Sequence, residues 1–76
     1  MSRKMRLKEI GCENITLYNA IANYGYKFTK NGVHYDLRHI LNDCGIVVNY
    51  FALNSINVHE KFYTWEETID FIKKLK

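Results

Sequence analysis

Five side chains in this sequence could ligate a metal ion or supply a nucleophile: Cys12, His34, His39, Cys44 and His59. Zinc sites place paired ligands two to four residues apart on a turn, or on one face of a helix. Here the central three ligand types follow one another at intervals of five residues, which on a helix points successive side chains in different directions. We interpret all five as ordinary histidines and reduced thiols, and we expect no metal and no cofactor.

A cysteine nucleophile needs a lowered pKa and an oriented base. Cys44 falls at the expected end of a helix, where the helix dipole opposes a thiolate, whereas Cys12 precedes an expected helix and is better placed. No oriented base, histidine or other, can be assigned to either thiol from the sequence, and each of the four glycines stands alone rather than in a phosphate-binding loop. The carboxylates are spread over turns and helix beginnings, which capping and solvation explain. We expect no catalytic activity.

The elements that must position any site begin with a helix at the carboxyl end. Thr64 and Glu67 have the spacing of a capping box, and acidic residues lead while lysines close the segment. The apolar residues behind the cap fall on one helical face. They are Trp65, Ile69, Phe71, Ile72 and Leu75.

Two hairpins are expected before this helix. Asn31-Gly32 is the preferred centre of a two-residue turn, and it would set Phe28 opposite Tyr35 and Tyr26 opposite Leu37. A second pair of strands is expected at 46–53 and 58–63, joined through residues 54–57. The apolar run that begins at Ile46 suggests a central strand covered on both faces.

Two short helices complete the predicted plan. Asn14 would cap a helix from Ile15 to Asn23 or Tyr24 that ends at Gly25, and Asp36 would cap a helix from Leu37 to Cys44 that ends at Gly45. The sequence does not decide whether Leu37 belongs to the first hairpin or to this helix. The sequence therefore predicts one α+β domain over residues 1–76, with an antiparallel sheet of two hairpins and three helices in the order α-ββ-α-ββ-α. Residues 1–10 would form a flexible basic leader.

Composition limits the class of protein. The 76 residues carry a net charge of +3, with 47% hydrophobic and 25% charged residues, which is typical of a globular domain and short of a dedicated nucleic-acid binder. No segment has the length and hydropathy of a membrane span or a signal peptide, and two cysteines are too few for a disulfide framework. We expect a cytoplasmic protein. Asn, Ile, Lys and Tyr fill 30 of the 76 positions, which is consistent with a low-GC genome, a phage or another mobile element.

A small protein-binding module is the function that this pattern favours, as an adaptor, inhibitor or regulator of another protein. Aromatic residues make up 14% of the chain, and large rings commonly anchor interfaces. An exposed edge strand such as 58–63 could also pair with a second copy in a homodimer. The candidate contact residues are Tyr18, Tyr24, Tyr50, Tyr63 and Trp65.

Nucleic-acid binding is the alternative. Basic residues gather at both ends of the chain, and lysines on the expected strands alternate with aromatic residues, an arrangement that suits phosphates and stacked bases. If the two ends of the chain lie together, their charges form one patch. The candidates are Arg3, Lys4, Arg6, Lys8, Lys27, Lys30, Lys61, Lys73, Lys74 and Lys76.

Overall fold

The computed structural model describes residues 2–20 and 23–75. The elements are α1 (Arg3–Glu9), β1 (Glu13–Ala20), β2 (Asn23–Lys30), β3 (Val33–Asp43), β4 (Ile46–Asn54), β5 (His59–Phe62) and α2 (Trp65–Lys73). The chain is thus α+β, with two helices and a five-stranded antiparallel sheet in the order β1-β2-β3-β4-β5. The predicted order of three helices and two separate hairpins is wrong, because strands replace the two helices expected at 15–24 and 37–44, and because α1 lies in a segment where no helix was expected.

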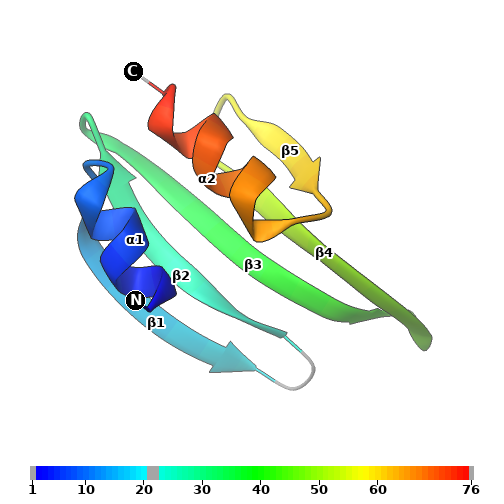
Figure 1. The fold of residues 1–76 in the computed structure, drawn as a ribbon. Helices are drawn as coiled ribbons and strands as arrows, with labels where there is room; N and C mark the ends of the chain where they lie inside the picture. The colour runs from blue at the N-terminus through cyan, green and yellow to red at the C-terminus, as the bar shows by residue number, and fades with distance from the viewer. Residues whose placement is uncertain (1, 21–22, 76) are drawn as a thin grey trace.

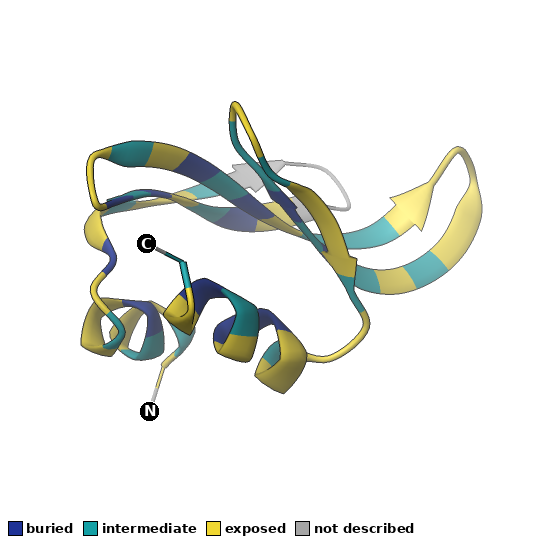
Figure 2. Ribbon diagram, turned by 90° about the horizontal axis from the view of Figure 1, so that it is seen from above, coloured by how far each residue is buried: buried dark blue, intermediate teal, exposed yellow. Residues whose placement is uncertain are grey.

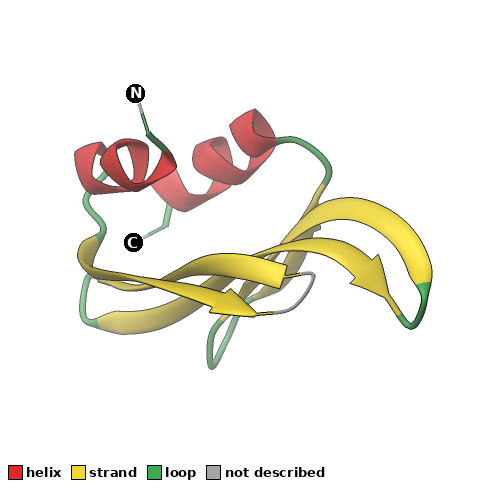
Figure 3. Ribbon diagram, turned by 90° about the horizontal axis from the view of Figure 1, so that it is seen from below, coloured by secondary structure: helices red, strands yellow, loops and turns green. Residues whose placement is uncertain are grey.

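Both helices lie against the same face of the sheet (Figures 1 and 3). We call this the helix face, and the opposite face, which no described element covers, the open face. An antiparallel sheet tolerates this arrangement because its side chains alternate between a packed and a solvated face. The residues that hold the fold together therefore lie on the helix face, and the side chains of the open face are left to solvent.

The core lies between the helix face and the two helices. Leu7 of α1 and Ile72 of α2 are fully buried, and they pack with alternate residues of β2, β3 and β4. The strand residues of this core are Phe28, Tyr35, Leu37, Phe51 and Leu53.

The predicted first hairpin is confirmed in its register. Phe28 pairs with Tyr35 and Tyr26 with Leu37, around a turn in which Asn31 and Gly32 have positive φ angles of 53° and 79°. Cys44 and Gly45 repeat this geometry at the next turn, with φ angles of 54° and 83°. Two residues with positive φ match the right-handed twist of the flanking strands, so Gly45 closes a hairpin rather than a helix.

The predicted helix from Ile15 to Asn23 or Tyr24 is wrong: its described residues lie in β1 and β2. Asn14 does not cap a helix but has a φ of 54° at an irregular pairing between Glu13 and Thr16, and its side chain donates to Thr29 Oγ1. Ile21 and Ala22, which fall within that predicted helix, lie outside the described residues. Gly25, expected as the helix end, is buried in the middle of β2. A segment rich in Ile, Thr and Tyr favours a strand once it has a partner to pair with.

The predicted helix from Leu37 to Cys44 is also wrong, because β3 continues through it to Asp43. Asp36 does not cap a helix; its carboxylate accepts from Arg38 Nε at 3.2 Å. Leu37 is buried in β3, and Cys44 is exposed at the turn. The described residues of β2 pair with this segment as far as Ile40, and β4 pairs with it as far as Asp43. The hydrogen bonds of these pairings outweigh its helical periodicity.

The carboxyl-terminal helix is confirmed as α2. The Glu67 amide donates to Thr64 Oγ1 at 3.1 Å, as the capping pattern predicts. At the other end, the buried ammonium of Lys30 donates to the Ile72 carbonyl at 2.5 Å and to the Lys73 carbonyl at 3.3 Å. A lysine from the sheet thus satisfies carbonyls that the end of a helix leaves free.

The far halves of β3 and β4 form an arm that extends beyond the helices (Figure 2). Only Phe51–Asn54 of β4 pairs with β5, so the preceding residues have a neighbour strand on one side only. Ile46 is 66% exposed and Val47 is 87% exposed. The expectation that this apolar run is covered on both faces is therefore wrong.

Candidate functional site

One row of residues crosses all five strands on the open face, because the strand pairs share a common register. Tyr18 pairs with Gly25, Gly25 with Arg38, Arg38 with Ala52, and Ala52 with Lys61. At the usual spacing of neighbouring strands, the row is about 19 Å long. We call this row the stripe. It alternates large or charged residues with the two smallest side chains.

Gly25 sets the shape of the stripe. A Cβ at this position would lie 2.1 Å from the Leu37 carbonyl oxygen, so the chain has no room for any side chain there. Without a side chain between them, residues on β1 and β3 approach each other over the backbone of β2. The guanidinium carbon of Arg38 consequently lies 5.4 Å from the centre of the Tyr18 ring.

Each end of the stripe carries an aromatic ring with cations beside it. Lys27 Nζ lies 5.6 Å from the centre of the Tyr18 ring, and Lys61 Nζ lies 4.8 Å from the centre of the Tyr50 ring. Such contacts favour conformations in which the long cationic side chains lie along the sheet surface. The open face thus presents cations and rings together.

The Tyr18 hydroxyl is the polar atom of this region that the structure leaves unsatisfied. Among the described residues it is buried and has no hydrogen-bond partner. Burial raises the pKa of Tyr18, the charge of Asp36 raises it further, and Arg38 opposes both.

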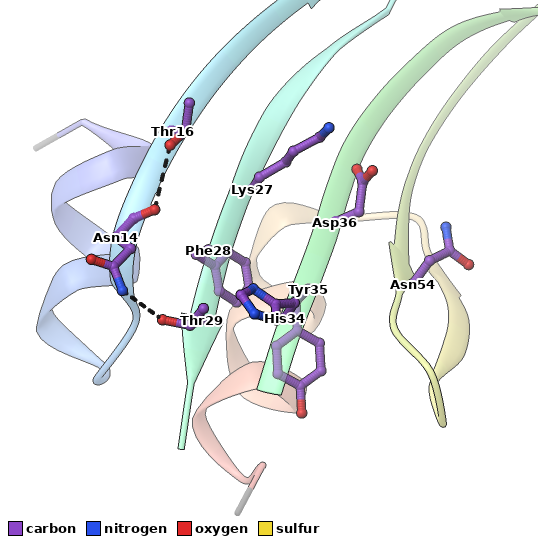
Figure 4. A pocket seen from close by; sticks show the side chains of 9 residues that line it. All are labelled: Asn14, Thr16, Lys27, Phe28, Thr29, His34, Tyr35, Asp36 and Asn54. Atoms are coloured by element: carbon purple, nitrogen blue, oxygen red, sulfur yellow. Dashed lines mark hydrogen bonds between the residues drawn. The ribbon is translucent and has the colours of Figure 1, made fainter. Parts of the chain in front are cut away.

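A polar depression of about 530 Å³ adjoins the stripe on the open face (Figure 4). The next row of the sheet crosses it, with Thr16 opposite Lys27, Lys27 opposite Asp36, and Asp36 opposite Asn54. His34 and Thr29, a cross-strand pair, extend it further. Arg38 holds the Asp36 carboxylate through both oxygens, which fixes the one acidic group of the depression next to the stripe.

The structure does not bring the five predicted protein-contact residues into one surface. Tyr18 and Tyr50 belong to the open face, whereas the Tyr24 ring contacts His39 and the Trp65 ring contacts Phe51 on the helix face. Tyr63 is 71% exposed between β5 and α2.

The predicted basic residues also divide between the layers. Lys27 and Lys61 lie on the open face, and Lys30 is buried as the cap of α2. Arg3 lies 5.0 Å from the ring centres of both Phe51 and Trp65, and Arg6 pairs with Glu66 at 2.6 Å. The remaining candidates lie on or just after the helices, apart from Lys76, which lies outside the described residues. They are Lys4, Lys8, Lys73 and Lys74.

The thiols and imidazoles do not assemble a reactive site in the described part of the chain. Cys12 is buried, and burial raises the pKa of its thiol to about 11, while the Lys30 charge opposes this rise. His39 contacts Asn49 Oδ1 at 2.7 Å, and His59 contacts Asn54 Oδ1 at 3.1 Å. Within residues 2–20 and 23–75, no three histidine, cysteine or carboxylate side chains gather as metal ligands.

Sequence reasoning missed Arg38, the central cation of the stripe. The sequence contains a pattern that could have identified it. The Asn31-Gly32 hairpin pairs Tyr26 with Leu37, and the next pair in the same register sets Gly25 opposite Arg38. Assigning both residues to helices hid this relationship.

Comparison with protein-family models, with curated proteins and with solved structures finds no match to this chain. Neither described helix is long and apolar enough to cross a bilayer. The function must therefore be inferred from the site itself.

Proposed function

We propose that this chain is a non-catalytic binding domain that holds a single-stranded nucleic acid across the open face of its sheet. The observation that carries this proposal is the stripe, in which Arg38 and Lys61 alternate with small residues and lie beside the Tyr18 and Tyr50 rings. Cations along a groove neutralise phosphates, and tyrosine rings supply surfaces on which bases stack.

The layered fold supports the proposal because it leaves this face uncovered. Sheet-based domains that bind single strands combine a free face with aromatic rings and flanking cations. Here the half-buried Tyr18 and Tyr50 rings lie beside Lys27, Arg38 and Lys61. The polar depression beside the stripe would receive a sugar or base edge, since its Lys27, His34 and Asp36 side chains offer donors and acceptors. The modest net charge of +3 fits a short site rather than a long electrostatic track.

A protein partner is the second candidate, and the same geometry favours it in one form. Arg38 and Lys61 would also pair with carboxylates of an acidic segment, with the two tyrosine rings as anchors. In that case the domain would act as an adaptor, inhibitor or regulator of another protein.

The test is fluorescence anisotropy of the purified chain with labelled single-stranded RNA, single-stranded DNA and duplex DNA of random sequence at two salt concentrations. We expect binding to the single strands to exceed binding to the duplex, and to weaken as salt rises because neutralised phosphates release counterions. Failure to bind either single strand at low salt would refute the nucleic-acid proposal, and a titration with an acidic peptide of alternating Glu and Tyr would then test the second candidate.

A further inference from the structure

Two neighbours hold the Arg38 side chain in one orientation. Its Nε and Nη2 atoms donate to the two carboxylate oxygens of Asp36, each at 3.2 Å, and its guanidinium carbon lies over the Tyr18 ring. A planar guanidinium that makes two parallel hydrogen bonds has little freedom to rotate. The Arg38 side chain nevertheless remains 45% exposed, so a ligand on the open face can reach it.

The oriented guanidinium keeps donors for such a ligand. An arginine carries five N–H donors, and Asp36 accepts from two of those of Arg38. The other three, two on Nη1 and one on Nη2, have no partner within residues 2–20 and 23–75. One donor of Nη1 and the remaining donor of Nη2 are parallel and lie in one plane. We call this pair the fork, and a ligand that matches it must present two acceptors side by side.

The surroundings of the fork suit a flat ligand. The neighbours of Arg38 along the stripe are Gly25 on β2 and Ala52 on β4. Neither has a side chain long enough to cover the fork. A planar ring can therefore approach the guanidinium from the open face.

Guanine has the edge that fits the fork best. Its O6 and N7 atoms are two acceptors side by side, and an arginine that donates to both is the commonest specific contact between a protein and a base. Adenine and uracil have no two adjacent acceptors on one edge, whereas unpaired cytosine offers N3 and O2 and is the nearest competitor. The oxygens of a phosphate would also match the fork, but the Asp36 carboxylate against the same guanidinium disfavours a second anion there.

We propose that Arg38, held by Asp36, recognises a guanine base of the bound single strand through O6 and N7. The inference rests on the proposed function and adds a base preference to it. Asp36 is a positioning residue, because it acts on the base through Arg38. The fifth donor of Arg38, on the side of the guanidinium away from Asp36, stays available to a phosphate of the same strand.

Fluorescence anisotropy with four single-stranded RNA octamers tests the base preference. Each octamer has uridines around one central guanine, adenine, cytosine or uracil. We expect the guanine octamer to bind about tenfold more tightly than the other three, because a bidentate contact to a base discriminates by about this factor. Inosine keeps O6 and N7 and should bind as guanine does, whereas 7-deazaguanine lacks N7 and should lose the preference. These probes need only the original chain.

Two variants test the roles of Arg38 and Asp36. Arg38→Lys keeps the charge and removes the fork, so it should lose the guanine preference and retain the salt dependence of binding. Asp36→Asn removes the carboxylate that orients Arg38 and should reduce the preference. Lys61→Gln is the matched control in the same stripe: it should weaken binding to all four octamers by the same factor and leave the preference unchanged.

Equal binding of the four octamers, a preference for cytosine, or full binding of the 7-deazaguanine octamer would overturn the base preference and leave nucleic-acid binding in place. A guanine preference that persists in Arg38→Lys, in a chain whose circular dichroism shows the native fold, would also overturn it. Failure to bind any octamer at low salt would instead refute the proposed function itself.

Discussion

Arg38 reaches the ring of Tyr18 across an intervening strand, with 5.4 Å between the guanidinium carbon and the ring centre. The strand between them contributes Gly25, which pairs with both residues. An aromatic ring packed over a cross-strand glycine fills the surface that the missing side chain leaves open, and the cation then rests against the ring. The contact between Tyr18 and Arg38 on the open face therefore depends on the absence of a side chain at Gly25.

Replacing Gly25 with alanine should therefore be strongly destabilising. The new Cβ would meet the Leu37 carbonyl oxygen at 2.1 Å, and backbone cannot yield as a flexible side chain does. We expect a loss of about 3 kcal/mol or more in the free energy of unfolding, measured by urea denaturation. Gly32→Ala is the control: a Cβ there meets nothing within 4 Å, although φ is +79°, and the loss in the free energy of unfolding should be about 1 kcal/mol. Equal losses at the two positions would contradict the crowding at Gly25.

Substitutions of Lys30 and Lys27, which both lie on β2, should have different effects: the first should lower stability and the second should lower nucleic-acid binding. The Lys30 ammonium donates to two carbonyls at the end of α2, so Lys30→Met leaves those acceptors unpaired and should cost about 1–3 kcal/mol of stability. Lys27 lies on the open face, where Lys27→Met should change stability by less than about 0.5 kcal/mol.

For nucleic-acid binding, the substitution at Lys27 should have the larger effect and the substitution at Lys30 the smaller. Lys27→Met should weaken the affinity for single-stranded RNA and reduce its salt dependence, whereas folded Lys30→Met should retain both. Thermal denaturation and anisotropy on the same two samples give both comparisons. If Lys30→Met is as stable as the original chain, Lys30 does not cap α2.

Only part of this architecture could be predicted from sequence. The Asn31-Gly32 turn and the Thr64 cap depend on a few adjacent residues with defined backbone geometry, so local reasoning found them. The segment around Leu17 and Tyr18 fits both a helical period and strand alternation, and pairing with β2 decides between them. The order of the strands depends on contacts between residues that are far apart in the sequence. A row of residues that crosses all five strands depends on the same contacts. The stripe could not be assembled while Arg38 was placed on a helix.

The two thiols should differ in reactivity. Burial raises the pKa of Cys12 to about 11, so its thiol remains neutral and shielded at neutral pH, while Cys44 is exposed in a turn. Alkylation with iodoacetamide should therefore modify Cys44 in the native chain, and Cys12 only after denaturation. Peptide mapping by mass spectrometry identifies the modified residue. Rapid modification of native Cys12 would show that its burial is wrong.

Stability should also depend on pH through Cys12. A thiol whose pKa is higher in the folded chain than in the unfolded chain stabilises the fold fully below the unfolded value near 9.0, and this contribution is lost as pH rises towards about 11. The difference in unfolding free energy between the original chain and Cys12→Ala should thus narrow over that interval. A difference that stays constant would contradict the pKa shift.

The most direct test of the proposed function is the affinity for single-stranded RNA of a variant that combines Arg38→Gln with Lys61→Gln. Its matched control combines Lys73→Gln with Lys74→Gln, which removes the same charge near the end of α2. We expect the stripe variant to lose most of its affinity and to show a smaller salt dependence, because two phosphate contacts are removed, while the control binds nearly as the original chain does. Equal losses in the two variants would show that net charge alone drives binding, and would contradict a site on the open face.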